Sequence, residues 1–439
     1  MLRTLRLGYL YLLFAALGMY WIPAPLVEDT RLFQLLFLIL IGFTALSARA
    51  LLEVGRIIEN NIVIFMLFAA WALTGFLGAA TAATNWDRIV VIRFTFYFAS
   101  ALCIVGNLNA TMQSGRAPSF SMFGWSALGG FLFGIFVLSG LSPLTVSGIV
   151  TAAIQTGNPD LIIFNLFGNR GVLYAEGVEF AAVLRHTISM VFVVCALLAI
   201  FDIKLHGIST ARIVLVVGLI FIVFLMQSRS SWLCLATGVT LVGIQTLRIP
   251  RFSILKFTIF FVILVISAAA FIKLLPLTIA RLSEERSFES RSDYLGDSIL
   301  LFLSHFFEPV PRAMIDGSPH NFIFDTALTS GVYGFLIATA IILWIVYTAL
   351  KTWKFERSGV FVALLLIFVI RSFTVGSGIP GPGTLIGLMM FFWYQKEHVL
   401  PQRTRRQSGP AGADAGPEAG AEGHPDGAPR RTAWADPNP

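Results

Sequence analysis

Long apolar runs alternate with shorter polar segments along most of the chain, and this pattern predicts membrane-spanning helices. We expect twelve of them, at residues 7–27, 32–48, 61–81, 89–107, 119–141, 180–201, 211–227, 231–247, 254–275, 321–349, 358–375 and 382–396. About 20 helical residues cross a hydrocarbon core of about 30 Å. The predicted fold class is therefore all-α, a polytopic membrane helical bundle with about twelve transmembrane helices.

Two polar segments, 142–179 and 276–320, are much longer than the other connections. The first contains Gly157-Asn158-Pro159-Asp160 and Gly168-Asn169-Arg170-Gly171, and both patterns are typical of turns. Within the second, residues 295–307 carry apolar side chains at a spacing close to that of a helix. This spacing predicts a short amphipathic helix that lies against the membrane or caps a cavity, or else an ordinary packed loop helix.

The composition changes abruptly at Pro401, where Pro, Gly, Ala and scattered charges replace the apolar residues. Such a segment cannot bury enough apolar surface to offset the entropy lost on ordering. We therefore expect two parts, a transmembrane domain at 1–400 and a disordered cytoplasmic tail at 401–439.

The composition agrees with a membrane protein and excludes a soluble globular one. Of 439 residues, 56% are hydrophobic and only 13% are charged, with a mean hydropathy of +0.81, whereas soluble chains carry about 25% charged residues. The net charge of +7 lies mostly between the apolar runs, where membrane topology explains it, so no nucleic-acid partner is expected. The three cysteines lack metal-type spacing, and we expect neither a disulfide nor a metal site.

The basic residues also predict an orientation. With a cytoplasmic N-terminus, thirteen of them fall in short inner segments and eight in outer ones, five of which belong to the two long segments. This agrees with the positive-inside rule. Arg3 and Arg6 before an apolar stretch imitate a signal peptide, but no small-residue cleavage site follows, so we expect a retained first helix. Both termini are then cytoplasmic, and both long segments lie outside.

Three polar features are candidates for chemistry at the outer side. Arg229 lies in the tight turn Gln227-Ser228-Arg229-Ser230-Ser231, between two predicted spans. An arginine there either extends towards the lipid headgroups or binds an anion. Arg291 precedes the predicted amphipathic helix, and it could instead pair with a neighbouring carboxylate. His320 and Asn321 begin the tenth span, where a histidine is either a helix cap or a proton acceptor.

Further candidates line the same predicted side. Arg185 and His186 fall inside the sixth span, where ionisable residues are costly and often functional. Glu176 and Glu179 are close enough in sequence to neutralise Arg185. Arg170 lies in the first long segment. Gly331 and Gly334, about three and four helical turns beyond His320, would let another helix pack closely.

In combination these features resemble the O-antigen ligase and polymerase superfamily of bacterial envelope enzymes. The resemblance rests on Ser228-Arg229 with Trp232-Leu233, on Arg291 with Tyr294, and on His320-Asn321 followed by Gly331 and Gly334. It covers residues 1–396 in architecture, but its specific motifs lie within 225–335. The loop before His320 departs from the glycine-rich pattern of many relatives, because it reads Glu308-Pro309-Val310-Pro311-Arg312. There, Arg312 could contact phosphate or pair with Glu308 or Asp316.

The resemblance implies transfer of a glycan from undecaprenyl pyrophosphate on the periplasmic side of the bacterial inner membrane, without metal or cofactor. Arg229 and Arg291 would hold the pyrophosphate, because a guanidinium fork matches phosphate oxygens. His320 would orient or deprotonate the acceptor hydroxyl, and direct displacement would invert the anomeric carbon. Arg170, Arg185, His186, Arg312 and Asn321 are expected to bind substrate. The implied partners are the lipid-linked glycan donor, a lipid A-core or growing-glycan acceptor, and membrane lipid.

The exact activity stays open at this stage. O-antigen ligation in lipopolysaccharide assembly is our first expectation, followed by polymerisation of O-antigen or exopolysaccharide repeat units and then by protein O-glycosylation. A secondary transporter or lipid-linked glycan flippase is the rival from another class. It predicts charged or broken helices near the bilayer midplane and pseudo-symmetric halves. A non-catalytic partner in an envelope complex is the third possibility.

Overall fold

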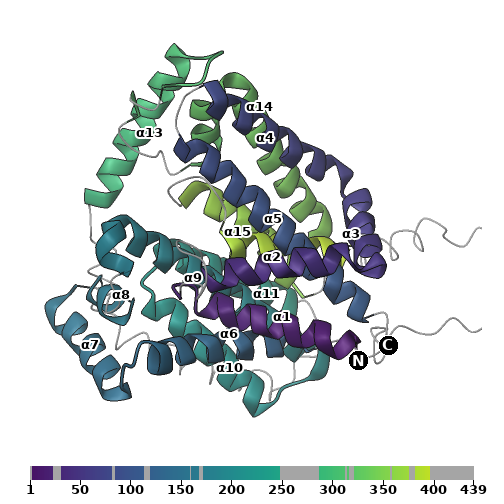
Figure 1. Cartoon of the computed structure of the whole chain (residues 1–439), viewed down its shortest axis with the longest axis vertical. Helices are drawn as coiled ribbons and strands as arrows, with labels where there is room; N and C mark the ends of the chain where they lie inside the picture. The colour runs from purple at the N-terminus through teal and green to yellow at the C-terminus, as the bar shows by residue number, and fades with distance from the viewer. Residues whose placement is uncertain are drawn as a thin grey trace, which may run out of the picture.

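The computed structural model describes residues 2–22, 31–81, 85–112, 119–158, 160–167, 172–247, 286–311, 314–315, 321–355, 358–374 and 381–395. Every regular element in these ranges is helical (Figure 1). The elements are α1 (Leu2–Gly18), α2 (Leu32–Ala45), α3 (Ala48–Asn60), α4 (Ile62–Thr81), α5 (Asn85–Met112), α6 (Ser121–Phe133), the π-helical turn η1 (Gly134–Leu138), α7 (Pro143–Thr156), α8 (Asp160–Phe167), α9 (Val172–His206), α10 (Thr210–Leu225), α11 (Arg229–Leu247), α13 (Arg286–Ser304), α14 (Phe322–Trp353), α15 (Val360–Thr374) and α16 (Pro382–Tyr394). The expected span at 254–275 and the tail at 401–439 lie outside the described residues.

Four of the described helices are long and apolar enough to cross a membrane, namely those containing Val91–Met112, Ser121–Leu138, Arg185–His206 and Phe322–Trp353. The bent pair α2–α3 would make a fifth if it counts as one span, and five shorter apolar helices accompany them. The described part of the chain is thus all-helical, and its long apolar helices are those of a membrane protein, as the hydropathy predicts. The number of twelve spans stays a prediction.

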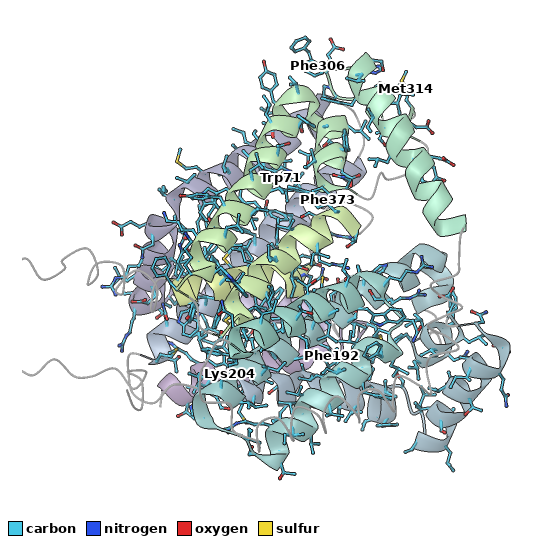
Figure 2. The ribbon with its side chains drawn as sticks, turned by 180° about the vertical axis from the view of Figure 1, so that it is seen from behind. Trp71, Phe192, Lys204, Phe306, Met314 and Phe373 are labelled. Carbon is cyan, nitrogen blue, oxygen red and sulfur yellow. The ribbon has the colours of Figure 1, made fainter. Side chains whose placement is uncertain are left out.

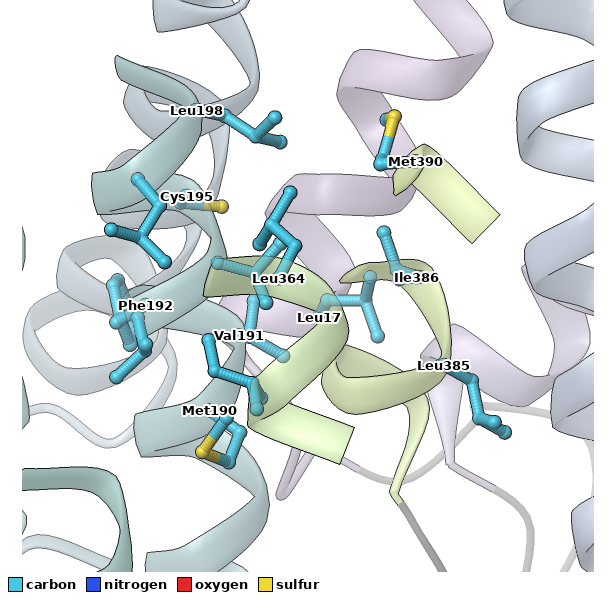
Figure 3. Close-up of a cluster of buried hydrophobic side chains, with 14 of the residues drawn as sticks. Leu17, Met190, Val191, Phe192, Cys195, Leu198, Leu364, Leu385, Ile386 and Met390 are labelled. Carbon is cyan, nitrogen blue, oxygen red and sulfur yellow. The ribbon is translucent and has the colours of Figure 1, made fainter. Parts of the chain in front are cut away.

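The core forms where α1, α9, α15 and α16 meet (Figure 3). Nearly every side chain from Ile188 to Ala199 in α9 is buried, and α16 is buried on all sides. Small residues bring neighbouring helices close: a methyl group added to Gly18 of α1 or Gly130 of α6 would overlap a backbone carbonyl of the other helix. Close backbone approach at glycine is a common way for membrane helices to associate, because lipid supplies little hydrophobic drive between them.

The second expected span, 32–48, corresponds to α2, and a further helix follows it directly. The chain turns by 98° between α2 and α3, so residues 48–60, expected to be an inner connection, form a helix across the end of α2. The side of α3 that faces the bundle carries a buried carboxylate, Glu53. This group accepts a hydrogen bond from Asn109 Nδ2 at 3.1 Å and pairs with Arg56 at 2.7 Å. These two contacts satisfy both carboxylate oxygens, and the hydrogen bond from Asn109 holds α3 against α5.

The two long polar segments are largely helical. Residues 142–179 contain α7, α8 and the start of α9, which begins at Val172 and not near residue 180 as expected. The turn at Gly157 is confirmed, because this residue ends α7 with φ +65°. The second expected turn, at 168–171, lies outside the described residues. In Figure 1, α7, α8 and α13 lie along the same edge of the molecule.

Polar contacts show which helix ends lie together. Asp202, near the end of α9, accepts a hydrogen bond from Ser121 Oγ at 2.6 Å and pairs with Arg212 Nε at 3.3 Å. Lys204 Nζ donates to the carbonyl oxygen of Ser358 at 2.8 Å. The end of α9 therefore meets the starts of α6, α10 and α15, as alternating spans predict.

Candidate functional site

A buried polar cluster lies at the opposite ends of α10 and α15. It combines the middle of α9, the turn between α10 and α11 with the first turn of α11, and the end of α15. We call it the serine–arginine cluster, and its members are His186, Ser189, Ser228, Ser230, Ser231 and Arg371.

Hydroxyl groups connect the histidine to the interior of the cluster. His186 Nδ1 lies 2.8 Å from Ser228 Oγ, which lies 2.9 Å from Ser231 Oγ. Ser231 Oγ is 2.6 Å from Ser189 Oγ, one turn along α9 from His186. All three serine side chains are fully buried. Each hydroxyl can both donate and accept, so the chain of bonds can adjust to either ring tautomer of His186.

Arg371 supplies the charge of the cluster. It is 4% exposed, and its Nη1 donates to Ser230 Oγ at 2.6 Å. Its Nε is buried without a hydrogen-bond acceptor, and no described carboxylate pairs with it. The position in the last turn of α15 favours a cation by up to about 2 kcal/mol. Burying an ion costs several kcal/mol, so the helix end alone does not offset the burial of this guanidinium.

The turn that carries Ser228 is strained. Gln227 is fully buried and has φ +52°, the only positive φ of a non-glycine residue in the described ranges. Its Nε2 donates to the carbonyl oxygen of Phe224 at 2.7 Å, which satisfies the end of α10. The Ser228 carbonyl accepts from the Trp232 amide at 3.0 Å and so begins α11. Strained backbone of this kind clusters at functional sites, where packing holds it in place.

Arg229 is the first residue of α11, as its position in the expected turn predicts. Its side chain is half-buried beside Ser228 and Ser230. The first amides of a helix lack partners within the helix, and its dipole favours anions there. The structure therefore joins Arg229, a helix start and Arg371 at one place. The sequence had indicated only the first two.

Arg185 has a partner that the sequence did not indicate. Its guanidinium pairs with Asp160, the first residue of α8. The side chains of Glu176 and Glu179 are outside the described part of the structure. The neutralising carboxylate that the structure shows thus comes from another helix, and the pair fastens α8 to α9. Its neighbour His186 belongs to the serine–arginine cluster, which supports a place for it at the site.

The remaining expected site residues are described in part. Arg170, Arg312 and His320 lie outside the described residues, and Arg291 is described only as a backbone position on α13. Asn321 caps α14, because its Oδ1 accepts from the amides of Ile323 at 3.0 Å and Phe324 at 3.4 Å. This cap occupies the side-chain oxygen of a residue that was expected to bind substrate.

The expected tenth span is broken at Gly331, which has φ 61° and ψ −153°. Residues 322–330 pack on α4, where Trp71 Nε1 donates to Thr326 Oγ1 at 3.0 Å. Beyond the break the chain folds back, so that a methyl group added to Gly334 would lie 2.5 Å from the Thr326 carbonyl oxygen. The prediction that both glycines admit another helix is therefore wrong for Gly331, which permits the break, and Gly334 instead admits the first segment of α14 itself.

The segment that follows α13 is fastened to this break. The Val332 amide donates to the Phe306 carbonyl at 2.8 Å, and the Val310 amide donates to the Leu328 carbonyl at 2.8 Å. These bonds satisfy backbone groups that the break removes from the helix ladder, as buried backbone requires. Figure 2 shows Phe306 at the tip where α13 meets α14.

The expected helix at 295–307 is confirmed, although α13 begins earlier, at Arg286, and ends at Ser304. Phe302 packs against Phe335 of α14, with ring centroids 5.3 Å apart. Leu300 and Leu303 are exposed on the helix, and so is Phe307 just beyond it. One side of the helix thus packs on the protein, while apolar groups remain on another side, as for a helix at a membrane surface.

Aromatic contacts bring the start of α14 near the cluster. The Phe322 ring lies 6.2 Å from that of Phe368, which is one turn before Arg371 on α15. The same ring lies 5.7 Å from that of Trp71. The Phe322 side chain therefore lies against α15, one turn before the residue that carries the charge of the serine–arginine cluster.

Sequence reasoning missed Arg371 and Ser189, and it did not connect the serines of the turn with His186. The signal for Arg371 was an ionisable residue inside an apolar run, the same signal that singled out Arg185. Among the described residues, no group of three or more His, Cys, Asp or Glu side chains could hold a metal ion. No protein-family model matches the chain, and no curated protein matches it significantly.

Proposed function

We propose that the protein transfers a glycan from undecaprenyl pyrophosphate to an acceptor sugar hydroxyl at the outer face of a bacterial inner membrane. The acceptor is the lipid A-core, which makes the reaction O-antigen ligation in lipopolysaccharide assembly. The observation that carries the proposal is a strained turn that presents Arg229 at a helix start beside the buried Arg371. Positive charge and helix amides together are suited to a phosphate-bearing ligand.

The residue roles follow from the charge that develops during transfer. The acceptor hydroxyl attacks the anomeric carbon, the bond from that carbon to the pyrophosphate oxygen breaks, and the configuration inverts. Arg229 and Arg291 stabilise the negative charge that the departing pyrophosphate gains. His320 accepts the hydroxyl proton. The nearness of Asn321-Phe322 to the end of α15 supports a site that combines these residues.

The proposed arrangement in the membrane is that of the sequence analysis. Both termini are cytoplasmic, twelve helices cross the bilayer, and α7, α8 and α13 lie on the periplasmic side. The shared edge of these three helices in Figure 1 supports placing the two long segments on one side.

The decisive experiment measures transfer from a lipid-linked glycan by the purified full-length protein. Replacing His320 with alanine should abolish transfer, whereas His305→Ala, a matched change at the end of α13, should leave it unaffected. Arg229→Lys and Arg291→Lys should each reduce transfer, because a point charge cannot reproduce the fork. Normal transfer by the His320→Ala protein, or by both lysine variants, would disprove the assigned roles.

Surface glycans after gene loss distinguish the activities within the superfamily. A core without polymer, with free lipid-linked polymer accumulating, indicates a ligase. Single repeat units on the core indicate an O-antigen or exopolysaccharide polymerase.

The break in α14 favours one second candidate, a transporter or lipid-linked glycan flippase. Discontinuous helices line substrate sites in many secondary transporters. Such a protein would move the lipid-linked glycan across the membrane of reconstituted vesicles without forming a new glycosidic bond. His320→Ala would then not change the joining of glycan to the acceptor in cells.

A further inference from the structure

Arg371 is a buried cation whose surroundings in the described structure contain no negative charge. Its one hydrogen bond goes to a neutral serine hydroxyl, Ser230 Oγ, at 2.6 Å. The other group of α11 close enough to feel its charge is the thiol of Cys234, one turn further on. An arginine stays protonated under all ordinary conditions, so it cannot escape burial by losing a proton. Among the described residues this positive charge has no counter-charge, and a bound anion would supply one.

The direction of the guanidinium indicates where that anion binds. Ser230 is the second residue of α11, a helix of 19 residues, so Arg371 points at the first turn of that helix. Its Nε is buried and has no acceptor. Helix amides and a second guanidinium, on Arg229, occur at the same turn. A ligand oxygen between α11 and α15 would meet donors from both helices.

The number of donors indicates the class of anion. Two guanidinium groups and the amides of a helix start exceed what a single carboxylate accepts, whereas a diphosphate offers several oxygens and more than one negative charge. We propose that Arg371 lines the buried side of a diphosphate site between the end of α15 and the first turn of α11. This inference rests on the proposed function and adds a third arginine to the donor site. Ser230, and through Ser228 also His186, position the guanidinium and the turn.

The test measures binding of undecaprenyl diphosphate to the full-length protein in phosphatidylcholine nanodiscs. Hydrogen bonds to charged groups are worth about 1.5–3 kcal/mol, which corresponds to about 10- to 100-fold in affinity. Arg371→Gln should weaken binding by that factor. Arg371→Lys, which keeps the charge without the fork, should give a smaller loss. Lys351→Gln removes an exposed positive charge at the end of α14 and is the matched control.

Thermal unfolding without ligand provides a second measurement. Removing an uncompensated buried charge should leave the melting temperature of Arg371→Gln equal to or above that of the natural protein. Added diphosphate should then raise it less than it raises the natural protein. A lower melting temperature, or failure to fold, together with normal binding by Arg371→Lys, would show that Arg371 is structural and would overturn the proposal.

Inorganic pyrophosphate and phosphatidylglycerol nanodiscs distinguish the sources of phosphate. Competition by pyrophosphate supports recognition of the diphosphate itself, and phosphatidylglycerol as effective as undecaprenyl diphosphate would refute it. Equal affinities of the natural protein and Arg371→Gln would also refute it. Binding that depends on Arg371 in a protein without glycan transfer leaves the inference standing and removes the proposed function. If Arg371→Gln changes neither glycan transfer nor binding, the inference about Arg371 is refuted and the proposed function stands.

Discussion

Replacing Gly331 with alanine should destabilise the protein strongly, because this residue sets the break in α14. Its φ of 61° with ψ −153° belongs to a region that only glycine adopts readily. Forcing another residue into it costs about 1–3 kcal/mol. The new Cβ would also lie 3.2 Å from the Phe306 carbonyl oxygen, which accepts the Val332 amide. Losing that buried bond adds about 1–3 kcal/mol, so we expect about 2–6 kcal/mol in total.

The assay is thermal unfolding of the purified protein in detergent at one fixed scan rate, because unfolding of large proteins is often irreversible. Gly129→Ala is the matched control: this glycine lies on an exposed part of α6 with no atom within 4 Å of an added methyl group. Alanine there should raise stability by about 0.5–1 kcal/mol. Gly334→Ala tests separately whether the chain folds back after the break. Alanine at this position should lower stability in the folded-back chain, where its methyl group meets the Thr326 carbonyl oxygen, but not in a straight helix.

One outcome would refute the reasoning about α14. If Gly331→Ala and Gly334→Ala both unfold at the same temperature as Gly129→Ala, the helix is continuous through residue 331. The hydrogen bonds between the loop after α13 and residues 328–332 could then not form as described. If the reasoning is right, Gly331→Ala should also lower glycan transfer, because α13 carries Arg291.

Two further predictions concern the opposite end of the bundle and the topology. Asp202→Asn should destabilise the protein by about 3–5 kcal/mol in the same assay, because it leaves Arg212 beside a neutral buried group. Asp297→Asn, on an exposed part of α13, should change stability little, and equal effects would contradict the structural role of Asp202. A cysteine placed at Ser287 should react with an impermeant reagent from outside the inner membrane. Labelling only from the cytoplasm would reverse the topology.

Much of the fold was predictable because membrane helices are identified by length and hydropathy. The helices around the expected spans 61–81, 211–227, 358–375 and 382–396 begin and end within a few residues of their expected limits. Bends were not predictable. The 98° turn between α2 and α3 falls where the apolar run ends, and the polar residues after it indicate a connection and not a second helix. The break at Gly331 falls inside an apolar stretch, where composition does not change. A glycine in such a stretch can serve packing or chain reversal, and only its backbone angles distinguish the two.

The candidate site was predictable only in its separate parts. Arg229 and His186 were identified because charged or ionisable groups are uncommon in apolar surroundings. The contact of Asp160 with Arg185 was not predictable, because packing of α8 on α9 brings the two residues together.

The sequence by itself determined the class of protein, the approximate helices and the polar residues able to carry chemistry, because hydropathy, helical period and side-chain type are local properties. Only the tertiary structure decided which of those residues meet. Arg371 reaches Ser230 across 141 positions in sequence, and His186 reaches Ser228 across 42. Such contacts depend on how helices cross and where they break, which results from the packing of all their side chains together.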